Sequence, residues 1–210
     1  MTSRARSAGV SRSAPSGRGA SSRVLRIIGG SWRGRRFRFS AEATIRPTPD
    51  RVRETLFNWL RDSIAGARCL DLFAGSGALG LEALSRGAAR VQFVDSDAAA
   101  AEDLRALLAQ WGAQSGSVAR MDVLRYLRTR AEPFDIVFVD PPFAAGLLGS
   151  ATRLLEDRAW LAPGALVYLE CAARSALPQL PATWVPLKAK RAGEVGYHLF
   201  QKNTPGGVTE

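Results

Sequence analysis

The sequence predicts an α/β fold built on a doubly wound, mostly parallel β-sheet with helices on both faces. Between residues 68 and 170, short apolar runs alternate with helical patterns, which is typical of parallel sheets. A glycine-rich turn at 75–80 joins the first apolar run to a helix. Acids follow three of the runs directly, at Asp71, Asp95 and Asp140. Since such sheets bind ligands beyond the carboxyl ends of their strands, we expect a functional site at that edge.

Length and composition indicate one domain with small additions. The chain has 210 residues, of which 46% are hydrophobic, so the material for a core is ample. No apolar run approaches the length of a membrane span, and the N-terminus lacks the apolar core of a signal peptide. We therefore expect a cytoplasmic protein that does not bind membranes. Cys69 and Cys171 lie in apolar runs and are expected to be buried free thiols, with no disulfide and no metal site.

The positive charge is concentrated at the N-terminus. Residues 1–41 contain ten arginines and no acid, so the remainder holds 29 − 10 = 19 basic residues against 19 acids. The whole net charge of +10 therefore lies in the first fifth of the chain. A concentrated arginine segment favours binding to phosphate backbones. Trp32, Phe37 and Phe39 lie between the arginines and are interpreted as stacking surfaces for RNA or single strands.

Composition divides the chain into four segments. Residues 1–22 are rich in Ser, Arg, Gly and Ala and are expected to form a disordered basic tail. Residues 23–44 are interpreted as a basic β-hairpin, with one strand near 24–28, glycine-containing turns, and a second strand at 36–39. Residues 45–202 form the main domain, and 203–210 a flexible C-terminus.

A helix is expected after the proline-rich loop at 45–50, capped by Thr48 or Asp50. Arg46, Arg51 and Arg53 lie near its start, where a positive charge opposes the helix dipole. Because stability does not explain these arginines, we interpret them as phosphate contacts.

The remaining elements follow in alternation. We expect strands at about 68–73, 90–95, 116–121, 134–139 and 165–170, helices at 77–86, 97–110 and 147–155, a short helix after residue 121, and two closing strands at 184–187 and 195–201.

The glycine-rich turn predicts a nucleotide-like cofactor. Gly75, Gly77 and Gly80 have the spacing G-x-G-x-x-G, which lets a backbone approach a ligand closely at a helix N-terminus. Asp95 follows the next strand and is placed to accept the hydroxyls of a ribose. Asp71 would repel the pyrophosphate of NAD but attract the sulfonium and ammonium of S-adenosylmethionine, which the sequence therefore favours.

Two other polar residues stand out in or near predicted strands. Asp122 follows the third strand and either accepts from an adenine amine or caps the next helix. His198, the only histidine, has no ligating neighbour and is interpreted as structural, so no metal site is expected.

The segment Asp140-Pro141-Pro142-Phe143 follows the fourth strand of the alternation and predicts the chemistry. Two prolines stiffen the turn and leave carbonyl acceptors free, Asp140 adds a side-chain acceptor, and Phe143 offers a stacking face. Acceptors that hold an exocyclic amine can turn its lone pair toward an electrophilic methyl, a task that needs alignment more than acid–base catalysis.

These motifs resemble those of class I S-adenosylmethionine-dependent amino-methyltransferases. Three longer stretches, 26–35, 46–60 and 73–86, are similar to the bacterial 16S ribosomal RNA guanine-N2 methyltransferase D family, and the resemblance covers residues 24–202. The resemblance implies a Rossmann-like, seven-stranded sheet with an N-terminal β-hairpin. It also implies methylation of one guanine N2, with 16S rRNA in a partly assembled small subunit as the partner; nothing in the sequence demands more than a monomer.

The resemblance also implies roles for individual residues. The catalytic set comprises Asp140, Pro141, Pro142 and Phe143. The S-adenosylmethionine-binding set comprises Asp71, Phe73, Gly75, Gly77, Asp95 and Asp122, with Asp97 as a second acid near the ribose. The RNA-binding set rests instead on the arginine-rich segment and the charges near the helix start; it comprises Arg26, Arg33, Arg35, Arg36, Arg46, Arg51 and Arg53. Two other functions stay open: adenine-N6 methylation of DNA, which usually needs a recognition domain for which no spare segment exists, and non-catalytic RNA binding.

Overall fold

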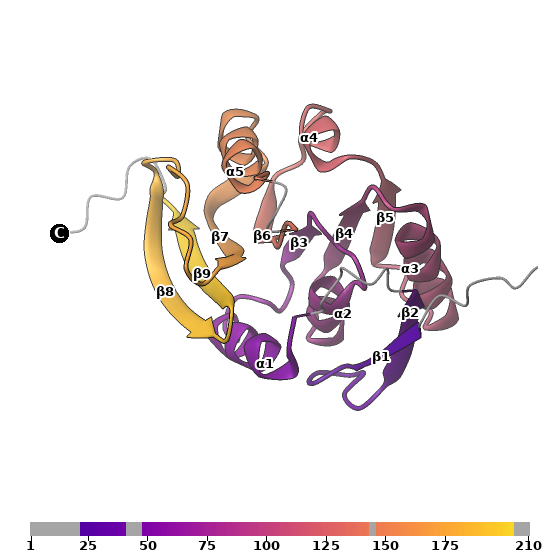
Figure 1. The fold of residues 1–210 in the computed structure, drawn as a ribbon. Coiled ribbons are helices and arrows are strands. Elements are labelled where there is room, and N and C mark those ends of the chain that lie inside the picture. Colours follow the sequence, from indigo (N-terminus) through magenta and orange to yellow (C-terminus); the bar gives the residue numbers. More distant parts are fainter. Residues whose placement is uncertain (1–21, 41–47, 143–145, 204–210) are drawn as a thin grey trace, which may run out of the picture.

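The computed structural model describes residues 22–40, 48–142 and 146–203. Its centre is a seven-stranded sheet in the order β5-β4-β3-β6-β7-β9-β8 (Figure 1). The strands β3 to β7 pair in parallel, whereas β9 runs antiparallel to both β7 and β8. The predicted mostly parallel sheet and Rossmann-like fold are thus confirmed. The strands are β3 (Arg68–Asp71), β4 (Arg90–Asp95), β5 (Gly116–Arg120), β6 (Phe134–Val139), β7 (Leu161–Ala172), β8 (Trp184–Ala192) and β9 (Val195–Lys202).

Helices cover both faces of this sheet (Figure 1). The helices α1, α2 and α3 share one apolar cluster with Phe93 and Phe138, and α4 and α5 share the other with Val94 and Val139. Successive residues of a strand point to opposite faces, so each of these central strands serves both clusters. The helices are α1 (Asp50–Trp59), α2 (Ala78–Ser85), α3 (Ala98–Gln110), α4 (Val123–Tyr126) and α5 (Leu148–Asp157).

The N-terminal hairpin forms as predicted, with β1 (Ser22–Arg26) antiparallel to β2 (Arg36–Ser40). Its aromatic residues correct the sequence-based interpretation: Phe37 and Phe39 are only 4% and 5% exposed and belong to the core. Trp32 and Phe37 pack edge-on against Trp111, which follows α3, at ring-centroid distances of 5.1 and 5.9 Å. Alternation along β2 therefore sends phenylalanines inward and arginines outward, and the buried rings are not available to stack on RNA.

The turn of the hairpin is fixed to the end of α2. The Ser85 hydroxyl donates to the Gly29 carbonyl at 2.6 Å and accepts from the Trp32 N–H at 2.9 Å. Gly30 has φ +76°, and a Cβ there would lie 1.8 Å from the Ser85 carbonyl oxygen. Only glycine fits this approach, so the hairpin is held at a defined place beside α2.

Helix α1 starts differently from the prediction. Its N-cap is Pro49, with no side-chain cap, and Asp50 is the first helical residue. The Thr48 side chain instead turns toward the carboxyl ends of β6 and β7.

The helices of the described ranges are short or polar: none of them is long and apolar enough to cross a membrane. Cys69 and Cys171 are buried and free, as expected. The expected tail at 1–22 and the C-terminus at 203–210 lie almost wholly outside the described residues.

Candidate active site

Three predicted acids meet at one edge of the sheet. Asp71 and Asp95 end β3 and β4, and Asp140 follows β6; these three parallel strands are neighbours. The strand order reverses between β3 and β6, which is where ligands of doubly wound sheets bind. None of the three acids forms a salt bridge with a basic residue of the described chain. The edge therefore carries carboxyl groups that no basic side chain of the described ranges compensates, which suits a cationic ligand.

The glycine-rich turn between β3 and α2 borders the site at this edge of the sheet. Gly77 has φ +75° and is the N-cap of α2, and a Cβ there would lie 2.2 Å from a methyl of Leu104. Gly75 also has positive φ, at +50°, and donates its N–H to Asp95 Oδ2 at 2.7 Å. The turn thus lies directly against the second acid, with half-buried Phe73 just before it.

Asp71 is the most deeply buried of these acids. It is 3% exposed and accepts the Gly80 N–H, in the first turn of α2, at 3.0 Å. Burial raises the pKa of Asp71 to about 7, and nearby Asp95 contributes to the rise, while the Gly80 hydrogen bond opposes it. A cation beside Asp71 would favour the ionised form, so this carboxyl fits a sulfonium or ammonium group.

The two acids near the end of β4 have different roles. Asp97 caps α3 by accepting the Ala100 N–H at 2.7 Å. Asp95 lies at the rim of the site and also accepts the Asp97 N–H, at 2.8 Å. Because Asp95 ends β4 and lies against the glycine turn, it is the better placed of the two to hold a ribose.

Asp122 adopts the capping role, one of the two alternatives that its position in the sequence allows. It is the N-cap of α4 and accepts the Arg125 N–H at 2.9 Å through Oδ1. Its side chain is exposed at the same edge of the sheet. Capping uses one carboxylate oxygen, and the second oxygen keeps its acceptor capacity.

The surroundings of Asp140 disfavour the ionised form of its carboxyl group. Burial and the neighbouring Glu170 carboxyl raise the pKa of Asp140 well above its usual range, and Asp71 adds to this effect. Pro141 is buried and Pro142 exposed beside it, while Phe143 lies outside the described residues.

Three residues of this cluster were missed as site residues. The Thr48 hydroxyl lies 3.4 Å from Asp140 Oδ2 and 3.2 Å from Glu170 Oε1, and the Tyr168 hydroxyl donates to Glu170 Oε1 at 2.7 Å. Glu170 is 2% exposed near the end of β7. The sequence carries a signal for Glu170, since an acid near the end of an apolar strand also marks Asp71, Asp95 and Asp140.

A cavity of about 230 Å³ opens beside Glu170 and the two prolines that follow Asp140. Its wall includes Pro141, Pro142, Glu170, Ala172 and Pro178. A larger hollow of about 420 Å³ lies against α3 and the start of β5, and no predicted site residue lines it. Position therefore favours the smaller cavity as the place for a substrate group.

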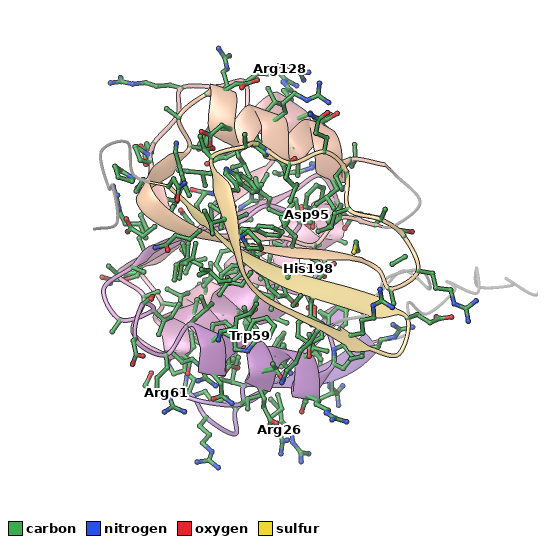
Figure 2. The ribbon with its side chains drawn as sticks, turned by 90° about the vertical axis from the view of Figure 1, so that its left-hand side faces the viewer. Arg26, Trp59, Arg61, Asp95, Arg128 and His198 are labelled. Carbon is green, nitrogen blue, oxygen red and sulfur yellow. The ribbon has the colours of Figure 1, made fainter. Side chains whose placement is uncertain are left out.

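The predicted RNA-binding arginines divide into two groups. Arg26, Arg33, Arg35, Arg36 and Arg51 are exposed. Figure 2 shows Arg26 extending outward on the α1 side of the molecule together with Arg61, which the sequence does not single out. Arg46 lies outside the described residues. Arg35 lies over the Trp111 ring at 5.5 Å, and Arg26 forms an exposed ion pair with Asp50 at 3.3 Å.

The predicted RNA contact of Arg53 is wrong, because its side chain is fully buried. It donates to Asp50 Oδ1 at 2.6 Å and to the Arg26 carbonyl at 3.0 Å, and it lies 3.8 Å from Glu82. The helix-dipole argument failed because Asp50 and Glu82 compensate this charge inside the protein.

His198 lies in β9, with Nε2 3.7 Å from the Cys171 sulfur. Burial lowers the pKa of His198, which disfavours its charged form. Across the part of the chain that the structure describes, no group of three or more ligating side chains could hold a metal ion.

Known proteins share this sequence and fold. The family model described as "Conserved hypothetical protein 95" matches residues 25–201. Ribosomal RNA small subunit methyltransferase D of Escherichia coli strain K12 is 48% identical over 182 residues, covering 87% of this chain and 92% of the relative. The protein of the same name from Haemophilus influenzae is 43% identical over 181 residues, covering 84% and 93%. The solved structure of yhhF from Escherichia coli, named as a methyltransferase, is 48% identical, with a TM-score of 0.80 and coverage of 86% and 99%.

The match extends over the hairpin, the glycine turn, the Asp140 segment and the closing strands alike. The chain therefore belongs to the family described as "Conserved hypothetical protein 95", together with the ribosomal RNA small subunit methyltransferase D proteins, and is a methyltransferase.

Proposed function

We propose that this methyltransferase transfers the methyl group of S-adenosylmethionine to the exocyclic N2 amine of one guanine in 16S ribosomal RNA. The observation that carries the proposal is the Asp140-Pro141-Pro142 segment at the reversal of strand order. It lies beside a glycine turn and the acids Asp71 and Asp95, which form no ion pair among the described residues. The proposed substrate is a partly assembled small subunit, in keeping with the names of the relatives.

The carboxyl-rich edge supports S-adenosylmethionine as the methyl donor. Bound there, it would supply an electrophilic methyl on a sulfonium. Asp71 would face its cationic methionine portion, Asp95 its ribose and Asp122 its adenine amine. The other residues proposed to border it are Phe73, Gly75 and Gly77.

The amine is held by acceptors of this chain. Asp140 and the Pro141 carbonyl would accept the two N2 hydrogens, which turns the nitrogen lone pair away from the ring and toward the methyl. The cavity beside Pro141 and Pro142 offers about 230 Å³ for the guanine. Phe143 is proposed as the stacking face. Methyl transfer would leave S-adenosylhomocysteine as the other product, and the methylated amine would then release its extra proton to solvent.

The substrate class is tested by following transfer of a labelled methyl group. Small subunits from cells lacking the enzyme, naked 16S RNA and DNA would be compared at equal concentration. We expect label in the subunits and less in naked RNA. Label in DNA alone would favour adenine methylation, and no label in any substrate would favour a non-catalytic RNA-binding protein.

Replacing Asp95 with alanine should weaken binding of S-adenosylmethionine by about 1–3 kcal/mol, the scale of a deleted charge-assisted hydrogen bond. The variant also leaves the Gly75 N–H without its acceptor, which loosens the glycine turn. Loss of the ribose contact and loosening of the turn should both weaken binding. Titration calorimetry measures the dissociation constant. The matched control is Asp97→Ser, which keeps an α3 cap; an unchanged constant for Asp95→Ala would remove Asp95 from the site.

The exposed hairpin arginines should contact phosphates. Changing Arg33, Arg35 and Arg36 together to glutamine is expected to flatten the slope of log K against log salt by about 0.7 for each phosphate of single-stranded RNA that is no longer neutralised. Binding titrations at several salt concentrations give this slope. Arg128→Gln is the control, because Figure 2 shows Arg128 on the side of the molecule opposite the hairpin residue Arg26. Equal slopes for the triple variant and the unaltered protein would contradict the RNA contact.

The arginines of residues 1–22 are proposed to add to this binding without serving catalysis. Deleting the segment should lower RNA affinity and flatten the salt slope while the single-turnover rate at saturating RNA stays unchanged. A truncated protein with the original slope would show that the segment does not bind RNA.

A further inference from the structure

Glu170 has no role in the proposed methyl transfer, yet it lies near Asp140, the residue proposed to hold the guanine amine. Its Oε1 atom is 3.2 Å from the Thr48 hydroxyl oxygen, which is 3.4 Å from Asp140 Oδ2. Thr48 is 6% exposed and Glu170 2% exposed. One threonine thus bridges two acids that come from the ends of neighbouring strands, β6 and β7.

A hydroxyl group has a single hydrogen, which limits the charge that this bridge can support. Between two ionised carboxylates, Thr48 could donate to only one, and the other would face an oxygen lone pair. When one carboxyl is protonated, Thr48 can donate its single hydrogen to the other, which stays ionised. The geometry therefore favours one proton on the pair.

The surroundings also disfavour two negative charges. Asp71 on β3 adds a third carboxyl, and burial raises the pKa of Tyr168 on β7, which favours the neutral phenol. Tyr197 on β9 packs against the Tyr168 ring. Tyr168 donates to Glu170 and so stabilises charge there rather than on Asp140. No salt bridge to Asp140 or Glu170 comes from the basic side chains of the described ranges. Burial raises the pKa of Glu170 to about 7, in agreement with this reasoning.

We propose that Glu170 is a positioning residue that shares one proton with Asp140 through the Thr48 hydroxyl, and thereby sets the pH above which Asp140 acts only as a hydrogen-bond acceptor. A protonated Asp140 would direct an O–H at the guanine amine, whereas an ionised Asp140 offers both oxygens to the amine hydrogens. The proton shared by Asp140 and Glu170 would thus determine the pH range in which Asp140 can accept the hydrogens of the guanine amine. This inference rests on the proposed function of Asp140, but the shared proton is a property of the free protein.

The two residues act on Asp140 in opposite directions, which separates this role from a structural one. Glu170→Gln removes a like charge, so Asp140 should lose its proton at a lower pH, in one step instead of two coupled ones. Thr48→Val removes a hydrogen-bond donor, so Asp140 should lose its proton at a higher pH. Thr48→Ser keeps the hydroxyl and should restore the original titration. Loosened packing alone would not move the titration in opposite directions.

The experiment is a ¹³C NMR titration of the free protein, labelled at the aspartate carboxyl carbons. The Asp140 signal is assigned by its loss in Asp140→Asn, which also separates it from the signal of Asp71. Glu102→Gln, an exposed acid on α3, is the control. The titrating limb of the single-turnover pH profile should move with the NMR midpoint, down for Glu170→Gln and up for Thr48→Val.

An Asp140 titration that is the same in the unaltered protein, Glu170→Gln and Thr48→Val would overturn the proposal. If a variant fails to fold, the titration of the unaltered protein alone tests the proposal. The Asp140 signal should then titrate in two coupled steps. A single step near pH 4 would contradict a shared proton. No RNA is present in the titration. A substrate other than guanine would therefore refute the proposed function and leave the NMR result standing.

Discussion

Replacing Asp140 with alanine is expected to lower the single-turnover rate by about 10²–10³, the scale found for other preorganised polar contacts. The guanine amine is a poor nucleophile because its lone pair is delocalised into the ring, and Asp140 is the side chain placed to hold its hydrogens. Alanine removes the acceptor and leaves the Pro141 carbonyl alone. The rate is measured at saturating S-adenosylmethionine and RNA, so that weakened binding does not enter.

The Asp140→Asn variant separates orientation from proton transfer. Asparagine keeps a carbonyl acceptor at the same place but cannot take a proton, so measurable turnover should remain. The structure makes this comparison necessary, because the raised pKa of Asp140 brings it nearer to that of a general base than the sequence suggests. If asparagine were as inactive as alanine while cofactor and RNA bound normally, a base or charge role would replace the orienting role.

Replacing Glu82 with glutamine should lower the free energy of unfolding by about 3–5 kcal/mol, the usual result of removing one partner from a buried ion pair. Glu82 is fully buried on α2 and accepts the N–H groups of Ile28 and Gly29 at 2.8 and 2.7 Å. It also pairs with Arg86 at 2.8 Å and lies 3.8 Å from Arg53. A glutamine NH₂ would oppose one of these donors and leave the Arg53 charge compensated only by Asp50.

Denaturant unfolding measures this loss, and the exposed acid Glu102, changed to glutamine, is the matched control, expected within about 0.5 kcal/mol of the unaltered protein. Because Glu82 fixes the backbone of the hairpin turn, the variant should also weaken RNA binding more than cofactor binding. A stability equal to that of the control would mean that the Glu82 cluster does not hold the hairpin.

The sheet and the cofactor turn are predictable from the sequence because they depend on local patterns. Alternating apolar runs place the parallel strands, and the G-x-G-x-x-G spacing places the turn and α2. Acids that follow a strand must lie at its carboxyl end, so the sequence alone gathers Asp71, Asp95 and Asp140 at one edge. Boundaries are less accurate: β7 begins at Leu161, four residues before the predicted start.

The errors concern residues whose partners are distant in the sequence. Arg53 lies near Glu82 and the Arg26 carbonyl, and neither contact can be inferred from the start of a helix. Phe37 and Phe39 alternate with arginines, a pattern that fits both an RNA surface and a hairpin packed on a core. Thr48 precedes a helix and looks like a cap, but its partners Asp140 and Glu170 are 92 and 122 residues away.

The most direct test of the proposed function identifies the atom that receives the methyl group. Small subunits from cells lacking the enzyme would be incubated with the protein and isotopically labelled S-adenosylmethionine, and the 16S RNA digested to nucleosides for mass spectrometry. The proposal predicts that the label appears in N2-methylguanosine, at one site per RNA, and is lost with Asp140→Ala. Label in N6-methyladenosine, or in any nucleoside other than N2-methylguanosine, would contradict it.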